Sequence, residues 1–463
     1  MDTYDVIVIG GGPAGENAAG RVADGGLSVV IVERELVGGE CSYWGCIPSK
    51  VLLRPGEVLG AVRRVPGARE AVTGELDAAA AFARRDEMTS NWDDSGQVPW
   101  LDDHGITLVR GAGRLAGERR VDVAHRDGST IELEARTAVV IATGTAAAVP
   151  PIPGLRDIRI WDNREATGAH DVPDRLLVLG GGVIGVEMAQ AFRHLGAGQV
   201  TIVEKAPRLV ANEEPFAGEE LADALRDDGI EVIVGVGMSE VQRASDDAPV
   251  IGVLEDGRQI EADEILVAVG RRANTADLGL ETIGLDAQGS LDVDDQLRVR
   301  GVQGDWLYAV GDVNGRALLT HMGKYQARIA ADVILGRDAE AWADHRAVPR
   351  VTFTDPQIAA VGLTEQRARD GGFDVRVVSF GTGDVAGASV SGEHMTGTSQ
   401  LVIDEARGVI IGATFTGHAV GEMLHAATIA IAGEVPLTTL WHAVPSFPTV
   451  SEVWLRLLEA ADL

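Results

Sequence analysis

The chain has 463 residues, of which 45% are hydrophobic and 4% aromatic, so it is long enough to bury several cores and form two to four domains. Its formal net charge of −30 argues against nucleic acid or an anionic membrane as a partner, because both would repel it at long range. No basic leader or apolar signal segment precedes the first predicted strand, and no run in the sequence approaches about 18 apolar residues, so we expect a cytoplasmic protein.

The first predicted elements lie in residues 4–34, which read as an apolar strand, a glycine turn, a helix of small residues and a second strand ending at Glu33. In the GxGxxG pattern, Gly10 supplies the tight turn, Gly12 the close approach of a pyrophosphate, and Gly15 the contact between helix and strand. Glu33 is placed to accept a hydrogen bond from a ribose 2′-hydroxyl. The stretch predicts a dinucleotide-binding fold.

Residues 38–50, GGECSYWGCIPSK, carry Cys41 and Cys46, the only two cysteines of the chain. In a helix that begins near Gly39, both sulfurs would lie in the first turns, where backbone N–H groups and the helix dipole favour a thiolate. Residues five apart do not share a helix face, so two structural thiols are a poor explanation. The spacing indicates a redox couple.

The pattern GGxCxxxGCIPSK resembles the active-site signature of the FAD-dependent pyridine nucleotide-disulfide oxidoreductases, a family that includes dihydrolipoamide dehydrogenase, glutathione reductase and mercuric reductase. The resemblance covers essentially the whole chain. It implies that Cys46 is the charge-transfer thiol against the flavin and that Cys41 is the interchange thiol facing the substrate. It also implies that Lys50, one of three lysines in the chain, pairs with Glu187 beside the flavin.

The next stretch predicts helices and then short strands. Residues 51–100 indicate an antiparallel helical excursion, and residues 105–145 alternate short strands with polar turns before an apolar strand closes on Thr143-Gly144. The resemblance implies that this turn contacts the flavin. The proline cluster at 149–155 marks a crossover between domains, because prolines block regular structure and stiffen a linker.

Residues 176–204 repeat the first nucleotide unit, with Gly180, Gly182 and Gly185 in the glycine turn and Glu204 at the end of the second strand. Two such units about 170 residues apart form an internal repeat. One nucleotide needs one such unit, so two units imply two cofactors. We expect FAD in the first and a nicotinamide cofactor in the second.

The nicotinamide cofactor can be inferred from the end of the second strand. Glu204 would bond a free 2′-hydroxyl and repel a 2′-phosphate, which favours NADH. Gly185 points the same way, because NADPH-using relatives often have alanine there. Lys205 and Arg208 lie close enough to accommodate a phosphate, so NADPH stays open. The apolar strand that ends at Gly270 resembles the return from the nicotinamide domain.

Residues 306–312 predict a strand leading into Gly311-Asp312. The resemblance implies that Asp312 binds the ribityl chain of the flavin and that the helix at 318–335 runs its amino end under the flavin ring. Asp312 suits an N-cap-like role facing a hydroxyl group. His321 matches a position near the pyrimidine edge of the flavin, and a plain helix histidine is the alternative.

After residue 348 the sequence changes to short strands and an alanine-rich helix at 418–433, whose largely apolar circumference requires a partner surface. This region resembles the family's dimerisation domain and implies a homodimer. The predicted fold is α/β, with two doubly wound Rossmann-like domains and a C-terminal α+β dimerisation domain. The predicted domains are FAD-binding 1–150 completed by a central segment 277–347, NAD(P)H-binding 151–276, and dimerisation 348–463.

The last segment departs from the family's pattern His-Pro-Thr-x-x-Glu. Residues 447–452 read FPTVSE, so Glu452 is kept while Phe447 stands at the position of the catalytic histidine. His442, five residues upstream, would need a remodelled chain to substitute. Without an imidazole, protonation of a leaving thiol loses general acid catalysis, typically ~10²–10⁴-fold.

Phe447, Tyr43 and Trp44 would line the substrate pocket with aromatic rings, and three functions stay open. The first is a reductase whose dithiol acts on a small acceptor, either a disulfide that brings its own acid, a metal ion or a persulfide. The second is a quinone-type reductase whose electrons leave directly from the flavin, which an apolar pocket favours. The third is a non-catalytic flavoprotein, against which the intact Cys41 and Cys46 argue. No resident metal site is expected, and mercuric reductase is disfavoured because the chain has no C-terminal cysteine pair.

Overall fold

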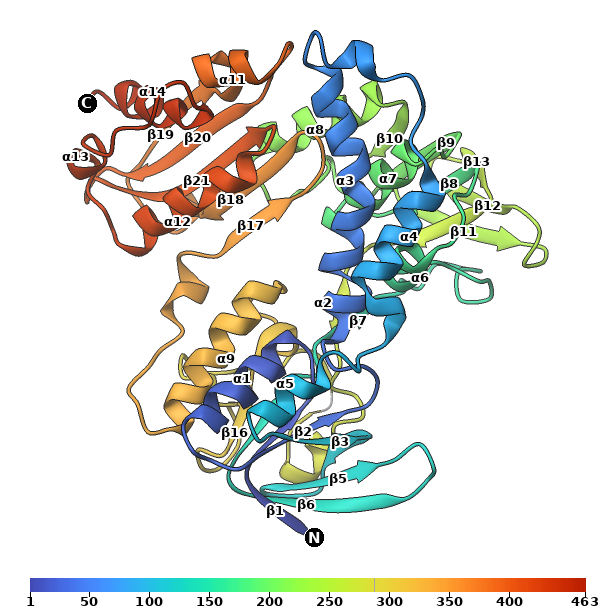
Figure 1. The fold of residues 1–463 in the computed structure, drawn as a ribbon, viewed down its shortest axis with the longest axis vertical. Coiled ribbons are helices and arrows are strands. Elements are labelled where there is room, and N and C mark those ends of the chain that lie inside the picture. The colour runs from blue at the N-terminus through green and yellow to red at the C-terminus, as the bar shows by residue number, and fades with distance from the viewer. Residues whose placement is uncertain (287) are drawn as a thin grey trace. The chain divides into compact units, whose positions relative to one another are not determined.

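The computed structural model describes residues 1–286 and 288–463, and the chain divides into two compact units (Figure 1). Unit 1 consists of Met1–Pro48, Arg85–Ala147 and Arg271–Asp344. Unit 2 consists of Ser49–Arg84, Ala148–Gly270 and His345–Leu463. In the described residues, no helix is long and apolar enough to span a bilayer.

Unit 1 is built on a sheet with the strand order β3-β2-β1-β6-β5-β4, and β16 also pairs with β6. Residues 6–9 of β1 are all buried, as is typical of a central parallel strand covered on both faces. The pairs that involve β1, β2, β3 and β16 are parallel, whereas β4 and β5 extend the sheet in antiparallel fashion. The strands of this sheet are β1 Asp2–Ile9, β2 Val29–Glu33, β3 Thr107–Arg110, β4 Ala112–Leu115, β5 Arg120–Ala124, β6 Thr130–Ile141 and β16 Leu307–Ala309. A separate two-stranded sheet consists of β7 Thr145–Ala147 and β15 Arg271–Ala273.

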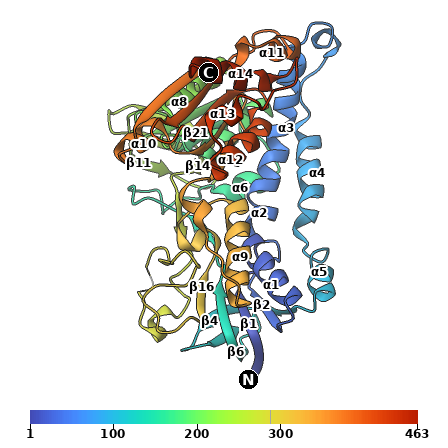
Figure 2. The ribbon, with the colours of Figure 1, turned by 90° about the vertical axis from the view of Figure 1, so that its left-hand side faces the viewer.

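The helices α1 and α9 lie side by side in both ribbon views (Figures 1 and 2). Their buried positions are mostly alanine and glycine, and small side chains let two helices approach closely. The two helices join the apolar cluster that includes the buried residues of β1, β2 and β6. The helices of this unit are α1 Pro13–Asp24, α2 Gly39–Tyr43, α5 Val98–Asp103 and α9 Thr320–Ile334.

Two helices cross the boundaries of the units: α3 Cys46–Arg63 and α4 Ala78–Met88. They form the helical excursion predicted for residues 51–100. Leu52 and Leu53 of α3 share one apolar cluster with Ala81 and Phe82 of α4.

Unit 2 contains a parallel sheet, β10-β9-β8-β14, and two antiparallel sheets, β11-β12-β13 and β17-β18-β21-β20-β19. The strands are β8 Arg175–Leu179, β9 Gln199–Glu204, β10 Ile230–Val234, β11 Met238–Arg243, β12 Val250–Leu254, β13 Gln259–Ala262, β14 Glu264–Val267, β17 Pro349–Thr352, β18 Gln357–Gly362, β19 Val375–Gly381, β20 Thr398–Asp404 and β21 Val409–Gly417. The helices are α6 Asn163–Gly168, α7 Val183–His194, α8 Pro215–Asp227, α10 Glu365–Asp370, α11 Ala386–Ser391, α12 Leu424–Ala432, α13 Leu437–Leu440 and α14 Val453–Ala460.

The predicted fold class is confirmed, since both nucleotide units form strand, glycine turn, helix and parallel strand, and the C-terminal region forms an antiparallel sheet with helices. The single helix predicted for residues 418–433 is wrong. A 3-10 turn at Val420–Met423 precedes the shorter α12, because Ala419 adopts a left-handed φ of 57° that interrupts the helix. On α12, Ile429 is 57% exposed.

Candidate redox-active site

The two cysteines lie on two helices and not on the single helix that the sequence analysis predicted. Cys41 lies in the short α2, and Cys46 is the first residue of α3. Trp44, with φ −138° and ψ 5°, ends α2, and Gly45 makes the turn between the helices. Two residues five positions apart do not share the face of one helix, but the break between α2 and α3 lets each cysteine be placed by its own helix. Both thiols are free, and they lie within hydrogen-bonding reach of each other.

The two thiols differ in their electrostatic surroundings. The hydrogen bond to Cys46, burial, and the charge of Cys46 all raise the pKa of Cys41, while Thr320 and Lys324 oppose this in part. The expected low-pKa thiol is therefore wrong for Cys41, which keeps its proton. Cys46 is exposed, and its Sγ lies 3.3 Å from Thr320 Oγ1 at the start of α9. The Cys41 thiol can thus donate a hydrogen bond to Cys46.

The aromatic residues between the cysteines do not both face solvent. Tyr43 is buried, at 3% exposure, and burial followed by nearby carboxylates raises the pKa of its hydroxyl to about 12. Trp44 is half-buried, and its ring centroid lies 5.7 Å from that of Tyr43. Tyr43 is therefore part of the packing of the cysteine segment.

Lys50 and Glu187 come together in unit 2 as an ion pair, with Nζ and Oε2 2.7 Å apart. Glu187 lies on the second turn of α7, and its side chain is 3% exposed. Its other oxygen accepts from the backbone N–H of Phe353 at 2.9 Å. Lys50 also lies 4.9 Å from the ring centroid of Phe353. The carboxylate is fixed from two sides, so it can orient the ammonium group.

The first glycine turn has the geometry that a dinucleotide needs. Gly10 has a φ of +107°, and a Cβ there would lie 2.4 Å from Ala142 O. A Cβ on Gly15 would lie 1.9 Å from Gly10 O, so only glycine allows α1 to pack so closely on the turn. At Gly12, which begins α1 without a side-chain cap, the nearest atom to a Cβ would be 3.9 Å away. The open space in front of uncapped N–H groups fits a pyrophosphate.

The second turn repeats this geometry. Gly180 has a φ of +111°, and a Cβ on Gly185 would lie 2.0 Å from Gly180 O. At Gly182, the uncapped start of α7, a Cβ would meet no described atom within 4 Å. Gly270, with a φ of +142°, is equally open. The residues present therefore fit a second nucleotide.

Glu33 and Glu204 have the same hydrogen-bond partners in their two turns. Glu33 Oε2 accepts from Gly11 N and Oε1 from Glu35 N, both at 2.6 Å. Glu204 Oε2 accepts from Gly181 N and Oε1 from Ala206 N, both at 2.6 Å. Each carboxylate therefore holds its glycine turn together at the end of the strand.

The cations near Glu204 are engaged elsewhere. Lys205 Nζ lies 3.2 Å from Glu255 Oε1, and Arg208 Nη2 donates to the backbone carbonyls of Ala211 at 2.8 Å and Glu213 at 3.1 Å. A 2′-phosphate would have to compete with these partners.

Thr143, Gly144 and Asp312 all make polar contacts within unit 1. Thr143 Oγ1 donates to Asn274 O at 2.9 Å, and Asn274 N–H donates to Gly144 O at 3.0 Å. Asp312 lies in a 3-10 turn, Gly311–Asn314, and does not cap α9, whose N-cap is Leu319. The predicted N-cap role is therefore wrong, because Asp312 lies seven positions before that cap.

Asp312 does face a hydroxyl group, that of Thr145, which donates to its Oδ2 at 2.8 Å. Burial raises the pKa of Asp312, and the bond from Thr145 and the charge of Arg271 oppose the rise. Arg271 Nε donates to Thr145 Oγ1 at 2.7 Å. Thr145 and Arg271 were missed by the sequence analysis. The sequence feature that could have identified them is their position, because each directly follows a glycine, Gly144 or Gly270, that was predicted to contact a cofactor.

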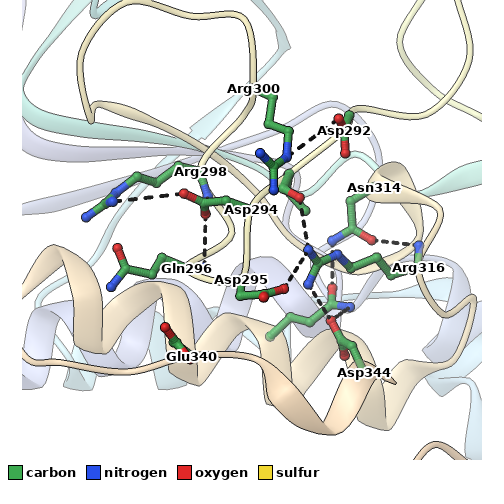
Figure 3. Close-up of polar contacts among 12 residues, drawn as sticks. Asp292, Asp294, Asp295, Gln296, Arg298, Arg300, Asn314, Arg316, Glu340 and Asp344 are labelled. Carbon is green, nitrogen blue, oxygen red and sulfur yellow. Dashed lines mark hydrogen bonds and ion pairs between the residues drawn. The ribbon is translucent and has the colours of Figure 1, made fainter. Parts of the chain in front are cut away.

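Gln326, which the sequence analysis also missed, supports the other side of the Gly311–Asn314 turn. Gln326 on α9 is fully buried, and its Oε1 accepts from Gly311 N and Asn314 Nδ2, both at 2.8 Å. Its Nε2 donates to Asp344 Oδ2 at 2.9 Å. Figure 3 shows that Arg316 contacts both Asp344 and Asp295, and that Asp295 belongs to the charged loop 292–300. His321, the expected flavin neighbour, is exposed on the first turn of α9.

The C-terminal segment places Phe447 and Glu452 in unit 2. Phe447 is 75% exposed, whereas Glu452 is buried and its Oε1 accepts from Arg456 Nη2 at 2.8 Å. Glu452 Oε2 is buried and has no hydrogen-bond partner among the described residues. Both residues line a pocket of about 120 Å³ together with Trp441. His442 is exposed.

Known protein families match almost the whole chain. A family model described as pyridine nucleotide-disulphide oxidoreductase matches residues 4–329, and a model described as its dimerisation domain matches residues 348–458. The chain is similar to a dihydrolipoyl dehydrogenase of Mycobacterium leprae, at 34% identity over 98% of this chain and 97% of the relative. It is similar to a mercuric reductase of Staphylococcus aureus, at 32% identity over 97% of this chain and 81% of the relative.

Solved structures give the same result. The HOCl-induced flavoprotein disulfide reductase RclA of Escherichia coli, described in one structure as a Cu(II) complex, superposes with a TM-score of 0.86 at 27% identity over 99% of each chain. LpdA of Mycobacterium tuberculosis superposes with a TM-score of 0.86 at 26% identity, again over 99% of each chain.

Proposed function

Because the chain belongs to the pyridine nucleotide-disulphide oxidoreductase family, we propose that it passes electrons from NADH through FAD to the Cys41/Cys46 pair and on to a small acceptor. Membership makes it an FAD-dependent oxidoreductase that uses a pyridine nucleotide and a disulfide redox centre. The observation that carries the proposal is the pair of free thiols, Cys41 and Cys46, which lie within hydrogen-bonding reach of each other.

When bound, FAD supplies the two-electron relay between the nicotinamide and the dithiol. The chain's own residues hold the protons and charges. In the reduced pair, Cys46 carries the thiolate, stabilised by the Cys41 thiol and by the Thr320 hydroxyl. Cys41 faces the acceptor, and delivery of two electrons to it re-forms the Cys41–Cys46 disulfide with release of the thiol proton. Lys50, oriented by Glu187, contributes a fixed positive charge.

The preference for NADH is supported by Glu204. Its charge would repel a 2′-phosphate, and the two nearby cations that could offset this are already engaged, Lys205 with Glu255 and Arg208 with backbone carbonyls. NADPH would have to displace these contacts to gain a cation.

For the acceptor, the C-terminal segment favours a molecule that needs no imidazole acid. Phe447 offers exposed apolar surface, and Glu452 pairs with Arg456. A quinone is the second candidate, because it can take electrons without thiol protonation and fits an apolar pocket. A metal ion is a further acceptor to test, since the RclA structure is described as a Cu(II) complex.

We also propose a homodimer in the cytoplasm. Residues 348–458 match a dimerisation domain, and this region exposes Val444 by 84% and Phe447 by 75%. A partner subunit would cover this apolar surface. Reduced thiols persist in the cytosol, where the pair could cycle.

The experiment is an anaerobic titration of the FAD-loaded protein with one equivalent of NADH, followed by assays with lipoamide, glutathione disulfide, benzoquinone and Cu(II). We expect a long-wavelength charge-transfer absorption that Cys46→Ser abolishes. Acceptor reduction that disappears in Cys41→Ser supports the dithiol route, and reduction that survives supports exit from the flavin. Bleaching without any charge-transfer absorption would reject redox contact between the cysteines and FAD.

A further inference from the structure

A run of left-handed backbone lies close to the cysteine segment in unit 1. Ser90, Asn91 and Trp92 have φ angles of 51°, 51° and 56°, and Asn91 has a ψ of 37°. L-residues other than glycine lose free energy in this conformation. Within residues 1–286 and 288–463, no other stretch places three such residues in succession. Strain of this kind persists where surrounding contacts impose it, and it is concentrated at functional sites.

The turn brings two side chains to the two ends of the cysteine segment. Trp92 Nε1 donates to Tyr43 O, at the end of α2, at 3.2 Å. Asp94 Oδ2 accepts from the N–H of Val37, just before α2, at 2.7 Å. Burial raises the pKa of Asp94, but the bonds from Arg110 and Val37 N–H outweigh this and leave the pKa below its usual value. The carboxylate therefore stays charged and keeps its hold on α2.

Trp92 is also held on its ring. The guanidinium of Arg85 lies 5.2 Å from the ring centroid of Trp92. Arg85 is fully buried, and its Nε donates to Asp86 Oδ1 at 2.6 Å. A desolvated cation attracts an indole ring more strongly than an exposed one does. Trp92 thus connects a fixed arginine to the last carbonyl of the helix that carries Cys41.

We propose that the Ser90–Trp92 turn is a positioning element of the redox centre, which fixes both ends of α2 so that the Cys41 thiol stays in hydrogen-bonding reach of Cys46. The left-handed backbone is the conformation that lets Trp92 and Asp94 contact opposite ends of a five-residue helix. The inference rests on the proposed function of the dithiol and adds the residues that hold it in place.

The test compares Trp92→Phe, which keeps a ring near Arg85 but removes the indole N–H, with Trp306→Phe. Trp306 is the matched control, because it is buried in the same unit and its Nε1 donates to Gln303 O, also at 3.2 Å. In dithiol-reduced protein, the hydrogen bond to Cys46 keeps Cys41 protonated and slow to react, so we expect Trp92→Phe to raise the rate of Cys41 alkylation by iodoacetamide about 2- to 10-fold, the effect of one lost hydrogen bond. Trp306→Phe should lower the melting temperature and leave this rate unchanged.

Ser90→Gly gives an independent measurement, because glycine adopts the left-handed conformation without strain. It should raise the melting temperature and keep the wild-type alkylation rate. An unchanged rate in Trp92→Phe, an equal change in Trp306→Phe, or no stabilisation in Ser90→Gly would overturn the inference. Failure of the proposed function looks different, because the wild type itself would then show no charge-transfer absorption on reduction.

Discussion

Removing the charge of Glu187 should slow flavin reduction, and only while Lys50 is present. The two groups are 2.7 Å apart, and Glu187 is 3% exposed while Lys50 is 33% exposed. A hydrogen bond between charged groups contributes roughly 1 kcal/mol more than a neutral one, and partial exposure of Lys50 keeps the difference at this low end. In Glu187→Gln, an oxygen remains for Phe353 N–H, so the loss is mainly that of the ion pair. About 1 kcal/mol corresponds to a roughly fivefold slower reduction.

The assay is stopped-flow reduction of the FAD-loaded protein by saturating NADH under anaerobic conditions. We expect Lys50→Met to slow reduction at least as much as Glu187→Gln, and the double variant to be no slower than Lys50→Met. Glu220→Gln is the control, because Glu220 lies in the same unit and accepts from the Thr398 hydroxyl at 2.6 Å. Equal slowing by Glu187→Gln in the presence and absence of Lys50 would show that Glu187 does not act through Lys50.

Three further predictions concern specificity, the acceptor and pH. Glu204→Ala should narrow the ratio of kcat/KM for NADH over NADPH by roughly 10- to 100-fold, and a wild-type preference for NADPH would contradict it. Phe447→His should raise turnover of small disulfides, by less than ~10⁴-fold, because it restores a general acid. Quinone reduction should survive Cys41→Ser, and fast wild-type turnover of a small disulfide that Cys41→Ser eliminates would reject the expected shift toward apolar acceptors. Burial raises the pKa of Glu16 from 4.5 to about 7, so the folded protein keeps a proton that the unfolded chain releases. Stability should therefore fall by about 3 kcal/mol as pH rises from about 4.5 to about 7, and urea unfolding of Glu16→Gln should lack this loss.

The glycine turns could be predicted from the sequence because their determinants are local. Gly10 and Gly15 contact each other within one turn of chain, and Glu33 bonds the N–H of Gly11 22 positions away in the same repeat. The second repeat follows the same spacing, so one pattern predicted both. Lys50 and Glu187, 137 positions apart, were paired only by resemblance to a family.

The break between the cysteine helices and the partners of Asp312 could not be predicted. α2 ends at Tyr43 because the chain turns at Trp44 and Gly45. The periodicity of the sequence carries no information about such a turn. Thr145 and Gln326 are ordinary polar residues in the sequence, and they become supports of the Gly311–Asp312 turn only when distant strands and α9 meet. Buried polar partners are chosen by tertiary packing, which composition and spacing leave open.

The carboxylates of Glu33 and Glu204 each hold a glycine turn and are also placed to bind a ribose hydroxyl, and this double role limits how the enzyme can change its cofactor. Each accepts from two backbone N–H groups of its own glycine turn, so its replacement leaves two donors to find other partners. A lineage or an engineer seeking NADPH therefore cannot simply exchange Glu204 for an apolar or basic residue. Glu204→Gln keeps one of the two acceptor oxygens, so the change also needs a new acceptor for Gly181 N–H or Ala206 N–H and a new cation nearby.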